Sequence, residues 1–337
     1  MNWDSVLNTL TQAPGVSGFE RTAAVAAAEL FEQFCDTEIT VSQSLIATLR
    51  SPAPKDAPLL VFDAHLDEIG LIVTDVDENG FLTFSCVGGI IPRHLPATEV
   101  CVHGTEDVYG VITSTPPHLA KPGSTQDVPD LRIDTGMTRD ELNDRVRPGD
   151  PVTFIGTTQH LANENRIVSR ALDDRGCCAI LLRIAELLHE NPPACRVAFT
   201  LTSCEEINGF GAKTTAFSLG ADKAIVIDVT HAKENMSAAP NNVHLGDGAC
   251  IDVAPILDRE IVATLKRLAK EKEIPWCTEV STSRTGTNSE DFAICGEGCP
   301  VGLISLPLRY MHTPSEVGDV RDMEACAQLS AAFAHTL

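Results

Sequence analysis

The chain has 337 residues, which is enough for a large hydrophobic core and favours two domains over one. Hydrophobic residues make up 43% of it and charged residues 21%, an ordinary balance for a globular protein. Its 47 acidic residues outnumber its 25 basic residues, and the formal net charge is −22. Such a surface repels phosphate backbones and anionic lipids, so we expect no nucleic-acid partner and no role at a membrane surface.

The N-terminal segment MNWDSVLNTLTQAPG has neither the basic nor the apolar region of a signal peptide. No apolar run approaches the ~20 residues that a membrane-spanning helix needs. We therefore expect a cytoplasmic protein. The 12 cysteines are scattered without paired C-x-x-C spacing, which predicts reduced thiols rather than disulfides or a structural metal site.

The first elements in chain order are two helices and two strands. Residues 4–12 and 19–34 predict helices on either side of the turn PGVSG, and LIATLR and residues 57–65 predict strands. From residue 69 to 165 the sequence consists of short β-like runs separated by Gly, Pro and Asp, with one helical segment, TRDELNDRV. This stretch predicts a small all-β domain, either a barrel or a sandwich.

After Ser169 helices and strands alternate again. We expect a helix over DRGCCAILLRIAELLHE, a strand over CRVAFTLTSCEE, a helix over NGFGAKTTAFSLG and a strand over KAIVIDV. A helix at 257–272, a strand at 301–307 and a helix from about residue 320 complete the pattern. The alternation predicts an α/β fold with a mainly parallel sheet covered by helices on both faces. The β segment would then be inserted into one discontinuous domain, residues 1–68 and 166–337.

Acidic and imidazole side chains gather where the predicted strands end or helices begin, which is where open α/β sheets place their ligand sites. These residues are His65, Asp67, Asp173, Asp174, Glu205, Glu206, Asp228 and His312. Buried acids without cations must find a partner or take up protons. Divalent metals solve this problem, and mixed His and carboxylate ligands suit zinc, cobalt or manganese. Taken alone, Asp173 also stands where a helix N-cap belongs.

The charge count favours two metal ions over one. A pair of dications would balance three ligating carboxylates and one hydroxide, with both histidines neutral. Two ions about 3.5–4 Å apart can share a water and lower its pKa. One acid must stay off the metals to act as general base, which explains why Glu205 and Glu206 are adjacent. The sequence does not show which of the two would ligate.

Nine segments in order carry a family resemblance. They are PGVSGFE, AHLDEIG, GGIIPRHLPATEV, LRIDTGMTRDEL, VRPGDPVTF, SRALDDRGC, TSCEEI, AIVIDVT and RYMHTPSEV. With the β insertion between them, the chain resembles the dimetal aminopeptidases that include glutamyl, deblocking and tetrahedral (TET) aminopeptidases, some of which carry a cellulase label. The resemblance implies a zinc-exopeptidase-like fold and removal of single N-terminal residues from short peptides.

The resemblance also implies a role for each site residue. His65 and Asp228 would bind one metal ion, Glu206 and His312 the other, and Asp173 would bridge them. Glu205 would deprotonate the bridging water and protonate the leaving amine, and Asp67 would orient the His65 ring. The family's metals are zinc or cobalt, two ions per subunit. Its usual assembly is a homo-oligomer in which dimers form a hollow dodecamer, with contacts through the inserted domain.

Three departures from the family pattern concern the substrate pocket. Cys204 stands where the family usually has glutamine, INGFGA replaces a more usual VGLRGA, and Asn288 occupies a common aspartate position. Cys204 has no adjacent activating histidine, so we do not expect a thiol nucleophile. Asp174 and Arg175 are expected to begin the helix and pair locally.

Three other functions stay open at this stage. An endoglucanase would use two carboxylates about 5–10 Å apart and no metal, whereas here the acids come with two histidines. A zinc carboxypeptidase or deacylase of similar architecture would share the ligands, and a non-catalytic binding protein would be expected to have lost some of them. The preferred N-terminal residue, the metal used in the cell and the choice between dimer and dodecamer are not defined by the sequence.

Overall fold

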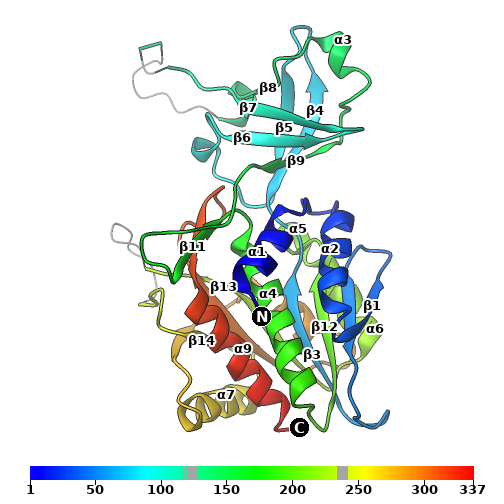
Figure 1. The fold of residues 1–337 in the computed structure, drawn as a ribbon, viewed down its shortest axis with the longest axis vertical. Coiled ribbons are helices and arrows are strands. Elements are labelled where there is room, and N and C mark those ends of the chain that lie inside the picture. Colours follow the sequence, from blue (N-terminus) through cyan, green and yellow to red (C-terminus); the bar gives the residue numbers. More distant parts are fainter. Residues whose placement is uncertain (117, 120–126, 234–241) are drawn as a thin grey trace.

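A computed structural model of the chain describes residues 1–116, 118–119, 127–233 and 242–337. Figure 1 shows an α/β body with a smaller β body set above it. The two bodies have separate hydrophobic cores, one around the long helix and the central strands and one inside the β body. Among the described residues, no helix has both the length and the apolar character that crossing a bilayer requires.

An eight-stranded sheet forms the centre of the α/β body. Its strands, in spatial order, are β1 (Cys35–Ile39), β2 (Leu45–Leu49), β12 (Arg196–Thr202), β3 (Leu59–His65), β13 (Lys223–His231), β16 (Val301–Leu308), β14 (Ala249–Val253) and β15 (Trp276–Val280). The four central strands β12, β3, β13 and β16 run parallel to one another. They read as nearly continuous apolar runs because both faces of a parallel sheet are covered.

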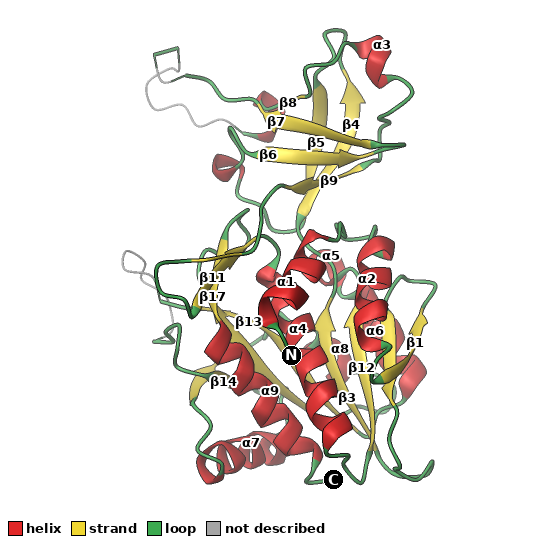
Figure 2. Ribbon diagram, viewed as in Figure 1, coloured by secondary structure: helices red, strands yellow, loops and turns green. Residues whose placement is uncertain are grey.

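Helices cover both faces of this sheet. The helices of the α/β body are α1 (Trp3–Gln12), α2 (Arg21–Phe31), α4 (Leu172–Glu190), α5 (Glu205–Asn208), α6 (Phe210–Leu219), α7 (Arg259–Glu271), α8 (Ser289–Ala293) and α9 (Val320–Ala334). Figure 2 shows α1, α4 and α9 in front of the sheet, with α8 behind it. The prediction of an α/β fold with helices on both faces is confirmed.

The β body is a closed six-stranded barrel. Its strands, in spatial order, are β4 (Gly70–Val76), β5 (Leu82–Val87), β8 (Ile133–Asp134), β7 (Asp107–Ile112), β6 (Glu99–His103) and β9 (Pro151–Phe154). The predicted helical piece forms the single turn α3 (Arg139–Leu142), which begins with a Thr138–Glu141 capping box. A barrel inserted into the α/β fold is therefore confirmed, and 69–165 as its domain limits stays a prediction.

A three-stranded sheet lies beside the chain's return from the barrel. It consists of β10 (Gln159–His160), β11 (Arg166–Ser169) and β17 (Glu316–Asp319). All pairs in it are antiparallel, and β17 leads directly into α9. This sheet places the start of α4 beside Glu316, which becomes important at the site.

The expected pairing of Asp174 with Arg175 is wrong. Arg175 is fully buried, and its guanidinium donates to the main-chain oxygens of Leu66, at 2.5 Å, and Leu10, at 2.5 Å. The Asp174 carboxylate instead accepts the main-chain N–H of His65, at 3.0 Å. Arg175 therefore joins α1 to the chain after β3 inside the protein. It supplies the hydrogen-bond donors that these buried carbonyl groups need.

We predict that Arg175→Met destabilises the fold strongly. The substitution keeps much of the apolar volume but leaves buried carbonyl oxygens without a donor, so the free energy of unfolding should fall by about 3–5 kcal/mol. Arg267→Met is the matched control, because Arg267 forms only an exposed pair with Glu271 and should change stability by less than about 0.5 kcal/mol. Equal effects of the two substitutions in urea denaturation would contradict this role.

Candidate active site

The parallel register of the central strands brings the first ligand candidates to one level. In β12 and β3, Thr202 pairs with His65, so the chain that follows β12 carries Glu205 and Glu206 past the end of β3. In β13 and β3, Val226 pairs with Asp63, and two residues further along stand Asp228 and His65. The predicted gathering of polar residues at the carboxyl edge of the sheet is thus what the structure shows.

One cavity of about 440 Å³ is lined by every predicted metal ligand. These ligands are His65, Asp173, Glu206, Asp228 and His312, and the predicted base Glu205 also lines it. They come from strands β3 and β13, the starts of helices α4 and α5, and the loop after β16. The residues predicted from the sequence are therefore far apart in the chain and close together in space.

Asp173 occupies the centre of this group. Its Oδ1 lies 3.0 Å from Nε2 of His65, and its Oδ2 lies 3.3 Å from Nε2 of His312. The His312 Nε2 is also 3.3 Å from Oε1 of Glu206. Asp173 does not cap α4: Ala171 stands at the N-cap, without a capping side chain, and Asp173 itself is outside the helical conformation.

Two overlapping triads have ligand atoms close enough to hold a metal ion. One consists of His65, Asp173 and Glu206, and the other of His65, Asp174 and Asp228, each with its ligand atoms within 4.8 Å of one another. The second triad brings in Asp174, which the sequence analysis had assigned to the helix start. The Asp174 side chain is fully buried, and its hydrogen bond from the main-chain N–H of His65 holds it beside the site.

The charges of this group call for added positive charge. Within the described part of the chain, Asp174 Oδ1 and Glu206 Oε1 are buried without a hydrogen bond. Burial raises the pKa values of Asp174 and Asp228 well above the usual value. Burial disfavours the His312 cation, but Asp173 and Glu206 raise the pKa of its ring to about 11. Buried acids of this kind need protons or cations to balance their charge, and an imidazole and carboxylate set fits divalent cations.

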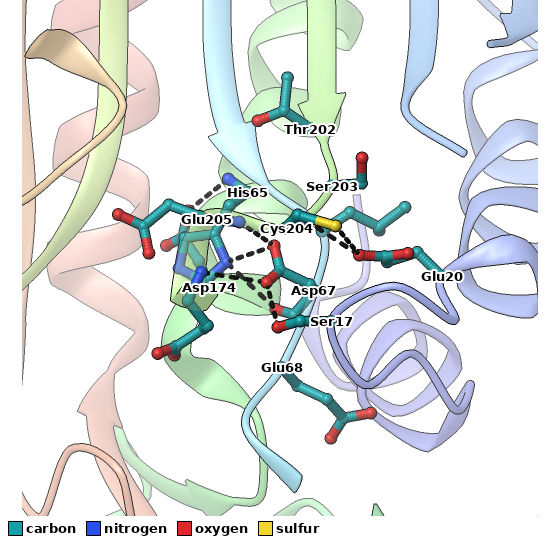
Figure 3. A network of polar contacts seen from close by, with 12 residues as sticks. Ser17, Glu20, His65, Asp67, Glu68, Asp174, Thr202, Ser203, Cys204 and Glu205 are labelled. Carbon is teal, nitrogen blue, oxygen red and sulfur yellow. Dashed lines mark hydrogen bonds and ion pairs between the residues drawn. The ribbon is translucent and has the colours of Figure 1, made fainter. Parts of the chain in front are cut away.

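Asp67 lies between His65 and the turn that begins at Glu205 (Figure 3). Its carboxylate accepts the main-chain N–H of Glu205 at 2.9 Å and that of Glu206 at 3.1 Å, and the Ser17 hydroxyl donates to it at 2.6 Å. The Nδ1 of His65 lies 3.1 Å from the Asp67 carbonyl oxygen and 3.5 Å from its Oδ1. The contact between Asp67 and His65 was expected from the sequence, whereas the hydrogen bonds from the main chain of the two glutamates to Asp67 were not.

Glu205 lies at the start of α5 and belongs to neither triad. Burial raises the pKa of its carboxyl to about 7, the repulsion of Glu206 adds to this effect, and His65 opposes it. A carboxyl group with a pKa near neutrality can both accept and return a proton.

Glu316 is a site residue that the sequence analysis did not single out. Its carboxylate accepts the main-chain N–H of Asp173 at 2.9 Å through one oxygen and that of His312 at 2.9 Å through the other. It therefore fixes the backbones of two ligand candidates that are far apart in the chain. Its place in the segment HTPSE, next to a ligand candidate, was the available signal.

The barrel side of the cavity contributes a glycine pair after β5. The Nδ1 of His312 lies 2.9 Å from the main-chain oxygen of Gly89, so its N–H can donate there and leave Nε2 directed at Asp173. A Cβ on Gly89 would lie 2.6 Å from that Nδ1, and Gly88 has a φ of +82°. This pair is glycine because the chain must turn here and approach the imidazole closely.

Cys204 and Asn288 lie outside the cavity. The Cys204 thiol donates to Glu20, and burial together with Glu20 raises its pKa to about 12, so the thiol stays protonated. The Asn288 amide donates to Asp63 at 2.9 Å and to Thr202 at 2.8 Å beneath the site. Neither residue is among those that line the cavity, so their expected effect on substrate preference would have to act indirectly.

Comparison with known proteins decides the family. A profile described as M42 glutamyl aminopeptidase matches residues 43–329. The chain belongs to this M42 aminopeptidase family. It is a metal-dependent exopeptidase that removes residues from peptide N-termini.

Two relatives of this M42 aminopeptidase match over nearly their whole length. A lysyl aminopeptidase of Pyrococcus furiosus is 28% identical, covering 100% of this chain and 98% of its own. The structure of an aminopeptidase from the archaeon Desulfurococcus kamchatkensis has a TM-score of 0.92 at 30% identity, with 99% and 95% coverage.

Two further structures bear on assembly and on the alternative function. The TET1 peptidase of Pyrococcus horikoshii, described as assembling into a tetrahedron or a large octahedral shell, has a TM-score of 0.88 at 29% identity, with full coverage of both chains. A Thermotoga maritima protein described as an endoglucanase has a TM-score of 0.80 at 29% identity, covering 98% and 96%.

We predict that Gly89→Ala weakens metal binding. The added Cβ must push the His312 ring away from the position in which it faces Asp173, and loss of such an orienting contact typically lowers metal affinity about 10- to 100-fold. Metal titration of the purified protein measures this. Gly156→Ala is the control, because its Cβ would meet its nearest neighbour, Pro314 O, at an ordinary 3.4 Å. Unchanged affinity in Gly89→Ala would show that His312 is not a ligand.

Proposed function

We propose that this M42 aminopeptidase binds two divalent ions in the cavity and uses them to hydrolyse the first peptide bond of short peptides. His65 and Asp228 would hold one ion, Glu206 and His312 the other, and Asp173 would bridge them. The observation that carries the proposal is that the two oxygens of Asp173 face different histidines, His65 and His312. A bridging carboxylate needs this arrangement.

The bound ions, as zinc, cobalt or manganese, would supply Lewis acidity, which lowers the pKa of a water and polarises the scissile carbonyl. Glu205 then accepts one proton from that water as the water oxygen attacks the carbonyl carbon. When the bond between carbon and nitrogen breaks, Glu205 returns the proton to the leaving nitrogen. The products are a free amino acid and a peptide one residue shorter.

The surrounding side chains fix the position of Glu205 and of the proposed ligands. Asp67 accepts the main-chain N–H groups of both glutamates, so the base and the neighbouring ligand are held by one carboxylate. Glu316 fixes Asp173 and His312 in the same way. Such fixed geometry lets proton transfer proceed without rearrangement of the site.

We also propose that the chain forms a homo-oligomer of dimers through the barrel, up to a dodecamer, as its TET relatives assemble. Enclosure in such an assembly would restrict the site to short or unfolded peptides. The mass of the purified protein in solution, measured by light scattering after size exclusion, tests this. A monomer would contradict it.

Metal removal tests the cofactor. We predict that chelation abolishes release of amino acids from peptides and that zinc, cobalt or manganese restores it. Adding metal should also raise the melting temperature, because ions that bind only the folded state stabilise it. Chelator-resistant hydrolysis, with no metal found by mass spectrometry, would contradict the two-metal proposal.

Substitution of Glu205 tests the base. Glu205→Gln keeps the size of the side chain and the main-chain N–H to Asp67, so metal content should be unchanged while kcat falls by about 10²–10⁴-fold. Glu271→Gln, on the exposed face of α7, is the control and should match the wild type. Full activity in Glu205→Gln would exclude it as the base.

The same preparations test the endoglucanase alternative. Glycoside hydrolysis by two carboxylates requires no metal and no histidine ligands, whereas the acids here alternate with His65 and His312. We expect no reducing ends from soluble cellulose. Their appearance without peptide turnover would favour the alternative.

A further inference from the structure

Two more acids line the cavity on the side of the sheet's far edge. Asp252 comes from β14 and Glu279 from β15, and the two residues are paired in the parallel register of these strands. Neither is needed for the proposed metal site or for proton transfer. In the antiparallel pairing of β14 with β16, the partner of Ser305 is Cys250, two residues before Asp252, and Ser305 is also the register partner of Asp228 in β13.

Their contacts bring the two carboxylates together near the ligands. The Ser305 hydroxyl donates to Asp252 at 2.7 Å, and the Thr230 hydroxyl donates to Glu279. Thr230 stands two residues beyond Asp228 on the same strand, so its side chain is on the same face of the sheet. The Glu279 side chain thus reaches from β15 back towards β13, and both acids face the space beside the metal ligands.

This part of the cavity is acidic. Among the described residues that line it, there is no lysine and no arginine. Asp252 is only 3% exposed, and burial, reinforced by Glu279, raises its pKa to about 8. A pair of acids in this setting favours a positively charged ligand, because a cation removes the cost of keeping a carboxylate in a buried place.

The position of the acids fits a long side chain. Adjacent strands lie about 4.8 Å apart and β16 lies between β13 and β14, so the backbones of Asp228 and Asp252 are at least about 10 Å apart. A substrate whose first peptide bond lies over the ligands must extend its first side chain to reach the acids. Leu303 and Met311 also line the cavity and offer apolar contact to a hydrocarbon stem.

We infer that Asp252 and Glu279 form the subsite for the first residue of the substrate and select a cationic side chain, lysine or arginine. The inference rests on the proposed function of the cavity. An N-terminal glutamate would meet two like charges there and is disfavoured. A neutral side chain of the same length would gain the apolar contact but not the charge.

The test compares reporter substrates that differ mainly in this charge. With the metal-loaded full-length protein, kcat/KM for lysyl and arginyl amides should exceed that for the norleucyl amide by about tenfold or more, since a tenfold ratio corresponds to 1.4 kcal/mol. The glutamyl amide should be the poorest. Asp252→Asn and Glu279→Gln should each lower the lysyl-to-norleucyl ratio at least about fivefold. Asp36→Asn, which removes an exposed acid far from the cavity, should keep the wild-type ratio.

A binding measurement gives a readout without catalysis. Calorimetry on the metal-free protein should show lysine binding more tightly than norleucine, with the difference lost in Asp252→Asn. The metal count per chain should be the same in the wild type and in Asp252→Asn. A metal ion lost on that substitution would assign the acids to a cation site and overturn the inference.

Failure of the inference is distinguishable from failure of the proposed function. Hydrolysis of the norleucyl amide at a rate equal to or above that of the lysyl amide would overturn the subsite and leave the aminopeptidase mechanism standing. If Asp252→Asn does not fold, the lysyl-to-norleucyl ratio of the wild type and of Glu279→Gln still tests the subsite. Absence of turnover for every amide with every metal would contradict both the subsite and the proposed function.

Discussion

The site depends on one constraint: several carboxylates lie together at the edge of a buried sheet, and the described residues that line their cavity include no lysine or arginine. Asp173 lies between two imidazoles, and Asp174, Glu206 and Asp228 are added around it. The acids are tolerable only with positive charge from elsewhere, and the metal ions that we propose for this site would supply it. The same ions would then both stabilise the buried acids and activate the attacking water.

Main-chain amides do most of the positioning around this group. Asp67 holds the turn that carries both glutamates, and Glu316 holds the backbones of Asp173 and His312. Each of these two carboxylates accepts hydrogen bonds from two main-chain N–H groups of the site. The main chain of the proposed ligands and of the proposed base is thus fixed by these hydrogen bonds, which explains how loops and helix starts can present a precise site.

The sequence predicted the inserted barrel, the parallel centre of the sheet and the gathering of ligand candidates, because continuous apolar strands and their polar ends carry strong patterns. It did not predict strands β14 and β15. In β14 a buried Asp252 interrupts the apolar run, and β15 is an edge strand with the exposed alternation of WCTEV. The acids that we assign to the substrate lie on these two strands, so the residues least visible in the sequence are the ones that bear on specificity. The hydrogen-bond partners of Arg175 were also not predicted, because every residue has a main-chain carbonyl and the sequence does not show which of them accepts.

The hydrogen bond from His312 to Gly89 joins the α/β body to a loop that leaves the barrel. Because of it, the barrel is not an appendage that could be trimmed away: a shortened chain would lose the acceptor that fixes one imidazole. Engineering or evolution of the outer surface of the barrel therefore has to preserve the path of this one loop. An enzyme reduced to the α/β body alone would carry an unsupported histidine at its centre.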